Sequence, residues 1–180
     1  MLWMVARSSG LESTAEVLFW PGVVLAVLSA VYTAFLFAQA KGRDFWQNPL
    51  LIIHLLAHAM VAGGACWLIL ELVLDPAGES VADARTFAAS GIIFSLFVIL
   101  AELLTTPATD DAHLAMKMIV GRPMGRWFWA AGLGMGHVLP LILLAAGFGW
   151  TNVGAAVLAL LGLLVIEWIW VLAPQRVPQS

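Results

Sequence analysis

Long apolar runs alternate with short polar segments along this chain. The apolar runs cover residues 17–39, 50–74, 85–106, 127–148 and 153–173. An α-helix of about 20 apolar residues crosses the hydrocarbon core of a bilayer and satisfies its own backbone hydrogen bonds there. The pattern therefore predicts an all-α membrane protein with five transmembrane helices in one domain, residues 17–173. A polar N-terminal segment, 1–16, and a C-terminal tail, 174–180, flank it.

The composition supports a membrane protein. Hydrophobic residues make up 62% of the chain and charged residues only 11%, whereas soluble domains carry about 25% charged residues. The net charge of −3 argues against a nucleic-acid partner. Cys66 is the single cysteine, so neither a disulfide framework nor a thiolate metal cage is expected.

The basic residues are unevenly divided between the two sides of the predicted membrane domain. One side would carry Lys41, Arg43, Lys117, Arg122, Arg126 and Arg176, and the other Arg7 and Arg85. Loops rich in Lys and Arg stay in the cytoplasm. We therefore expect the N-terminus outside and the C-terminus in the cytoplasm.

The longest polar stretch, residues 107–126, has an amphipathic middle that Thr109 can cap. One interpretation is a helix lying on the membrane surface. The functional alternative is a docking surface for a partner. Its candidate residues are His113, Lys117, Arg122 and Arg126.

Small residues recur at a spacing of four inside two apolar runs. Ala59 is followed by Gly63, and Gly132 by Gly136. One face of small residues lets two helix backbones approach closely. We expect helix–helix contacts at both pairs.

Five ionisable residues lie inside the apolar runs, on four different helices. They are His54, His58, Glu102, His137 and Glu167. With a rise of 1.5 Å per residue, all five fall roughly 6–15 Å from the predicted cytoplasmic edge. Ionisable groups inside a membrane are costly and usually functional. The set suits a quinone pocket or a proton path.

Two other interpretations of these residues remain open. The side chains could simply form hydrogen bonds between helices. Alternatively, His58 and His137 could ligate a haem from two facing helices.

Six motifs occur in order along the chain: Tyr32-Thr-Ala-Phe-Leu-Phe, Lys41-Gly-Arg-Asp-Phe-Trp, Asn48-Pro-Leu-Leu, Ala62-Gly-Gly-Ala, Gly136-His-Val-Leu-Pro-Leu and Glu167-Trp-Ile-Trp-Val-Leu-Ala-Pro-Gln. This ordered set resembles the NrfD/PsrC family of integral membrane subunits. Members of this family usually have eight to ten spans in two four-helix bundles. This chain resembles the C-terminal four-helix bundle plus one C-terminal helix.

The resemblance implies a subunit of a quinone-linked respiratory complex in the bacterial cytoplasmic (inner) membrane. Such a subunit is not catalytic alone. It anchors an iron-sulfur subunit and exchanges electrons with menaquinone or ubiquinone, and a molybdopterin or multihaem cytochrome subunit completes the complex. No haem or metal is expected in this chain. The resemblance leaves three explanations for the N-terminal bundle: a second membrane subunit that supplies it, a truncated gene product, or a reduced homologue.

Two alternative functions remain open at this point. One is a b-type haem membrane anchor. The other is a purely structural anchor or assembly subunit.

Overall fold

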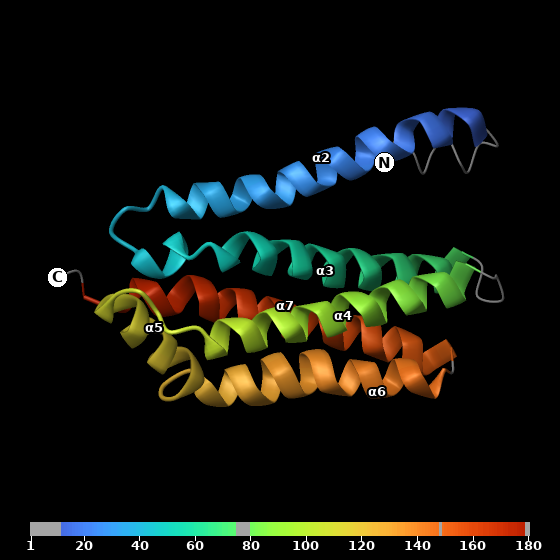
Figure 1. The fold of residues 1–180 in the computed structure, drawn as a ribbon. Helices are drawn as coiled ribbons and strands as arrows, with labels where there is room; N and C mark the ends of the chain where they lie inside the picture. Colours follow the sequence, from blue (N-terminus) through green and yellow to red (C-terminus); the bar gives the residue numbers. More distant parts are fainter. Residues whose placement is uncertain (1–11, 75–79, 148, 179–180) are drawn as a thin grey trace.

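The computed structural model describes residues 12–74, 80–147 and 149–178. Arg7 and most of the predicted N-terminal segment therefore lie outside the described residues. The helices are α2 (Glu12–Ala38), the 3₁₀-helix η1 (Asp44–Gln47), α3 (Leu50–Leu74), α4 (Ser80–Leu104), α5 (Asp110–Val120), the π-helix η2 (Trp127–Val138), α6 (Leu139–Ala146) and α7 (Gly149–Gln175) (Figure 1).

The structure confirms the fold class. Five helical segments are long and apolar enough to cross a membrane, with η2 and α6 together forming one of them. Helices α2, α4 and α7 start four or five residues before the predicted spans, and the other boundaries differ by at most two residues; α2 starts at Glu12 rather than Val17. Helix α4 starts at Ser80, inside the polar segment predicted between residues 74 and 85. The carboxylate of Asp83 lies in its first turn, where it interacts favourably with the positive end of the helix dipole. Helix α7 starts at Gly149 rather than Val153, because the left-handed Gly147 already ends α6.

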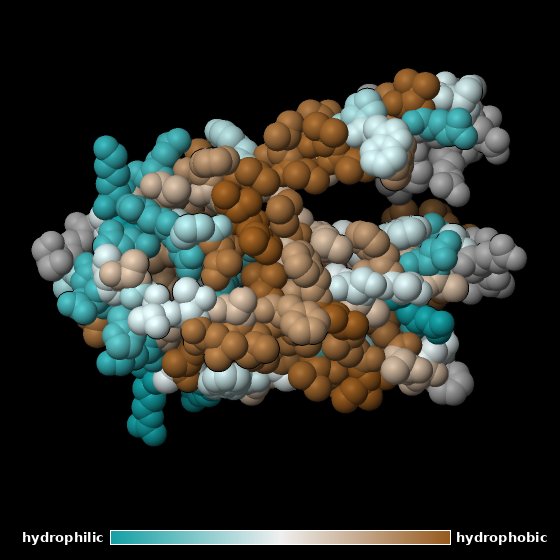
Figure 2. All heavy atoms as spheres, viewed as in Figure 1, coloured by the Kyte–Doolittle hydropathy of each residue, from teal (hydrophilic) through white to brown (hydrophobic). Residues whose placement is uncertain are grey.

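Helix α7 packs in the middle of the molecule. It contacts α3, α4, α5, η2 and α6, whereas α2 contacts α3 and η1 at the side of the bundle (Figure 1). Only 6% of the apolar window of α2 is buried, compared with 33–44% in the other spans. Figure 2 shows open space between part of α2 and the rest of the molecule.

The helix outside the bundle is thus the first one and not the last. The face of α7 that is buried consists largely of small residues, among them Ala155, Ala156, Ala159 and Gly162. These let neighbouring backbones come close. Helix α2 also carries small residues at a spacing of four, Gly22, Ala26, Ala30, Ala34 and Ala38, but only Ala34 of these is buried, and bulky Val, Leu and Phe side chains around them are exposed.

Two glycine contacts bring helices together. A Cβ atom added to Gly64 of α3 would lie 2.8 Å from the backbone of Ala88 of α4. A Cβ atom added to Gly136 would collide with the backbone of Gly162, which joins η2 to α7. The predicted contact face at Gly132 and Gly136 is therefore confirmed. The one at Ala59 and Gly63 is wrong, because Gly63 faces open space and the neighbouring Gly64 makes the contact.

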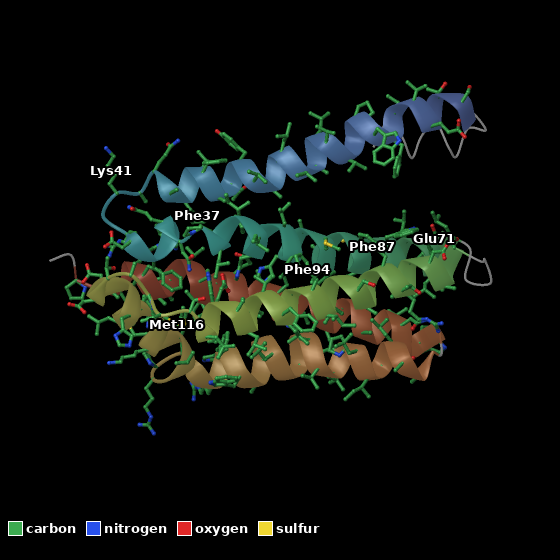
Figure 3. All side chains as sticks on the ribbon, viewed as in Figure 1. Phe37, Lys41, Glu71, Phe87, Phe94 and Met116 are labelled. Carbon is green, nitrogen blue, oxygen red and sulfur yellow. The ribbon has the colours of Figure 1, made fainter. Side chains whose placement is uncertain are left out.

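Six basic residues gather at one end of the bundle, which we call the basic end: Lys41, Arg43, Lys117, Arg122, Arg126 and Arg176. This end comprises the loop before α3, helix α5 and the end of α7, and it is largely hydrophilic in Figure 2. A guanidinium nitrogen of Arg43 donates to the carbonyl oxygens of Pro174 and Val177 at 2.8 Å each. These carbonyls lie at the end of α7, where no following helical turn supplies N–H groups to bond to them. Lys41 and Glu71 lie at opposite ends (Figure 3).

We predict that Gly64→Ala destabilises the protein while Gly63→Ala does not. The new methyl group at residue 64 must push the α4 backbone away, which we expect to cost about 1–3 kcal/mol. At residue 63 the methyl group meets no atom within 4 Å, so the change should be neutral or slightly stabilising. Thermal unfolding of both variants in one detergent tests this. Equal melting temperatures would contradict the close α3–α4 contact.

Candidate functional site

Two histidine–glutamate pairs lie inside the bundle near the basic end. His54 Nδ1 of α3 lies 2.9 Å from Glu102 Oε2 of α4. One turn along α3, His58 Nδ1 lies 2.6 Å from Glu167 Oε1 of α7. Each pair joins two helices and leaves neither carboxylate without a polar partner.

The two pairs form one continuous network through the histidines. The rings of His54 and His58 lie next to each other, with their centroids 4.0 Å apart. The indole ring of Trp170, from α7, stacks on His54 at 4.8 Å. The order across the bundle is therefore Glu102, His54, His58 and Glu167, which we call the His–Glu network.

The network is closed at one end and open at the other. Glu102 and His54 are buried, with at most 3% of their surface exposed, whereas the Glu167 side chain is 33% exposed. Glu167 also lines a narrow apolar groove between α2, α3 and α7, together with Phe37, Trp46, Leu51, Leu55, Trp170 and Val171. Phe37 extends from α2 towards this groove (Figure 3), where its ring lies 5.0 Å from that of Trp46. The groove encloses a cavity of about 10 Å³.

Two nitrogen atoms in the network have no partner. Nε2 of His54 and Nε2 of His58 are buried, and neither forms a hydrogen bond in the described part of the chain. Buried polar atoms are nearly always paired, so an unpaired one points to a missing ligand or water. The network therefore has unused capacity to bind a proton donor or a cation.

The structure separates His137 from the other four predicted residues. Its Nδ1 lies 2.9 Å from the carbonyl oxygen of Gly132 and its Nε2 lies 2.9 Å from the hydroxyl of Ser95. Nδ1 donates, because a carbonyl oxygen can only accept, and in the neutral ring Nε2 then accepts from the hydroxyl. His137 thus fixes η2 to α4. Haem ligation by His137 would require the Ser95 bond to break.

The polar layer lies between two apolar clusters. One cluster, at the basic end, includes Ile99, Phe128 and Ile166. The other, towards the opposite end, includes Leu68, Ile92 and Leu144. The hydrophobic packing of both clusters holds the four helices in register around the polar groups.

The predicted docking residues lie elsewhere, on and beside α5. His113, Lys117, Arg122 and Arg126 are not buried. Thr109 caps α5 as predicted, because its hydroxyl accepts from the backbone N–H of Ala112 at 3.3 Å. Glu71, near the other end, accepts from Trp67 and Ser80 and takes no part in the His–Glu network.

A model of the family described as "Polysulphide reductase, NrfD" matches residues 1–178 of this sequence. The chain belongs to the NrfD family. It is 24% identical over 157 residues to a provisionally named membrane subunit of the dimethyl sulfoxide reductase of Halobacterium salinarum, covering 80% of this chain and 35% of that protein. It is 27% identical over 126 residues to protein NrfD of Escherichia coli K12, covering 67% of this chain and 40% of that protein.

This NrfD-family chain thus corresponds to well under half the length of the curated relatives it matches. No solved structure matches it. Family membership and the five apolar helices together show a multi-pass integral membrane protein.

Sequence reasoning missed three residues that shape the site: Trp46, Ser95 and Trp170. Ser95 is one of several hydroxyl residues in α4, and only the packing against η2 distinguishes it. Trp46 is buried and donates its indole N–H to the carbonyl oxygen of Trp170 at 3.2 Å. The density of tryptophans in residues 167–170 was the one available signal for an aromatic wall.

We predict that Ser95→Ala lowers stability, whereas Ser90→Ala does not. Removal of the Ser95 hydroxyl leaves Nε2 of His137 buried without a donor, which typically costs about 1–3 kcal/mol. Ser90 lies on the same helix but is exposed, and its hydroxyl bonds only to the carbonyl of Thr86 one turn earlier. Melting temperatures in the same detergent compare the two. A loss for Ser90→Ala as large as for Ser95→Ala would contradict the assigned bond.

Proposed function

We propose that this chain is a membrane subunit of a quinone-linked oxidoreductase complex, in which the His–Glu network exchanges protons with the quinone. The observation that carries the proposal is the His58–Glu167 pair at the edge of an aromatic-lined groove. A partly exposed carboxylate inside a membrane span is costly, and such a residue usually marks a functional site. The names of the two relatives, a dimethyl sulfoxide reductase membrane subunit and protein NrfD, support the assignment to a reductase complex.

The chemical character of the groove fits a quinone head group. Aromatic side chains of Phe37, Trp46 and Trp170 suit a flat ring, and the carboxylate of Glu167 suits a hydroxyl group. A cavity of about 10 Å³ holds at most a single water. Entry of a ring therefore requires the groove to widen. The weakly packed α2 is the wall best able to move.

A quinone supplies two-electron chemistry that is coupled to the uptake or release of protons. Glu167 lies at the open end of the network, so it would exchange a proton with the ligand. His58 would receive that proton through the 2.6 Å contact between Nδ1 and Oε1. The His54 ring lies beside that of His58, and a water bridging their unpaired Nε2 atoms would carry the proton on towards Glu102. In this proposal the network disperses the charge that a single buried residue could not hold.

The expected partners follow from the same proposal. An iron-sulfur subunit would carry electrons, and a molybdopterin or multihaem cytochrome subunit would complete the complex. A second membrane subunit would supply the bundle that corresponds to the rest of the relatives' length. The ligand is menaquinone or ubiquinone, and the proposal assigns no haem to this chain. We place the protein in the bacterial inner membrane with its basic end in the cytoplasm.

We predict that Glu167→Gln and His58→Gln each slow quinol turnover at least tenfold in the assembled complex. Both substitutions keep the approximate size of the side chain but remove its ability to carry a proton. The measurement is quinol-dependent reduction of the complex's natural acceptor, made in membranes that contain equal amounts of the complex. Glu71→Gln is the control, because Glu71 lies near the opposite end of the same helix as His58.

A complex that assembles normally and keeps full turnover in both variants would contradict this proposal. That result would favour a purely structural anchor. A visible haem spectrum in the purified chain that disappears in His137→Ala would instead favour the haem anchor.

We also predict that the basic residues of the docking surface hold the extrinsic partner. Combined substitution of Lys117, Arg122 and Arg126 by Glu should reduce the amount of iron-sulfur subunit that co-purifies in mild detergent. The wild-type complex should lose the same subunit as ionic strength rises, because exposed charge pairs are screened by salt. Unchanged recovery of the partner from the triple variant would place the docking surface elsewhere.

A further inference from the structure

The two unpaired histidine nitrogens and the Glu167 carboxylate suggest a use of the network that proton transfer alone does not explain. We propose that His54, His58 and Glu167 form a binding site for one divalent transition-metal ion of the zinc type. Each residue can offer one ligand atom, and these atoms all lie within 4.8 Å of one another. The ligand set is two imidazole nitrogens and one carboxylate oxygen, which is typical of zinc sites that keep one position open.

The geometry requires only small side-chain movements. Zinc binds nitrogen and oxygen at about 2.0–2.2 Å, so tetrahedral ligand atoms lie about 3.3 Å apart. Closing from 4.8 Å to that separation needs about 1.5 Å of movement. The three side chains share that movement, and Glu167 is the one that is partly exposed at the groove. The same exposure gives the ion a way in.

The second layer of contacts also fits a metal site. Histidine ligands usually donate their other ring nitrogen to a carboxylate, which fixes the ring and strengthens the ligand. Glu102 makes this contact with Nδ1 of His54 at 2.9 Å, leaving the unpaired Nε2 free to bind. Trp170 further restrains the His54 ring by stacking on it.

The charges balance as well. When both histidines are neutral and both carboxyl groups are ionised, Glu102 and Glu167 place two negative charges inside the bundle. One divalent cation neutralises both, where two protons would otherwise be needed. A bound ion therefore competes with the protons of the network. If the proposed function holds, the ion inhibits quinol turnover by blocking proton exchange.

Metal binding by the purified full-length chain, with its affinity tag removed, tests the site without any quinone assay. After equilibration with buffered Zn²⁺, the metal content per chain is measured by elemental mass spectrometry. Wild type and His113→Gln should each hold one ion with equal affinity, since His113 is exposed on α5. His58→Gln and Glu167→Gln should bind at least tenfold more weakly. Glu102→Gln should weaken binding about tenfold or more through the lost second-layer contact.

The spectrum of wild-type protein loaded with Co²⁺ provides a test that depends on no variant. Four-coordinate Co²⁺ should give intense visible absorption bands, and Zn²⁺ should displace them. Absence of metal from the wild type, or equal binding by wild type, His58→Gln and Glu167→Gln, would overturn the site. Tight binding without any effect of Zn²⁺ on quinol turnover would keep the site and refute its link to the proposed function.

Discussion

The pairing of two carboxylates with two histidines inside a membrane bundle is the constraint on which the rest of the structure depends. An isolated charge in this setting would cost several kcal/mol, and breaking one partner out of a buried pair typically costs about 3–5 kcal/mol. His54 and His58 must therefore face α4 and α7 simultaneously, and this fixes the rotation of α3 about its axis. The aromatic and aliphatic clusters on either side of the polar layer are arranged around that rotation.

Close packing of α7 makes the pairing possible. Small residues bring the α7 backbone close to η2 at Gly136 and Gly162, and on another face the same helix brings Glu167 to His58 of α3. The π-helical η2 contributes from the other side. His137 lies five residues after Gly132, which is the spacing of a π-helical turn, and its ring bonds to the Gly132 carbonyl, while Ser95 joins the same ring to α4. Polar contacts inside the bundle and glycine contacts at the helix–helix interfaces thus stabilise each other.

Hydrophobicity alone predicted the five spans, because the need to satisfy backbone groups in hydrocarbon leaves few choices. It also singled out four of the residues that meet in the network, since charges are conspicuous in apolar runs. It could not predict which carboxylate meets which histidine. That depends on helix rotation, which the nearly uniform apolar faces of α3 and α4 do not encode. It likewise could not place α2 outside the bundle, because both its hydropathy and its regular spacing of small residues, from Gly22 to Ala38, resemble those of the buried spans.

The exposed end of the His–Glu network and the weakly packed α2 lie on the same side of the bundle. Glu102 is enclosed by the bundle, but Glu167 opens on the one side where the neighbouring helix packs weakly. Lipid is a poor neighbour for a carboxylate, so this side is stable only when something polar or proteinaceous covers it. A quinone head group, a metal ion and a further helical bundle would each meet that need at the same place. Ligand binding and subunit assembly would then be coupled, because whatever closes α2 onto the bundle also determines access to Glu167.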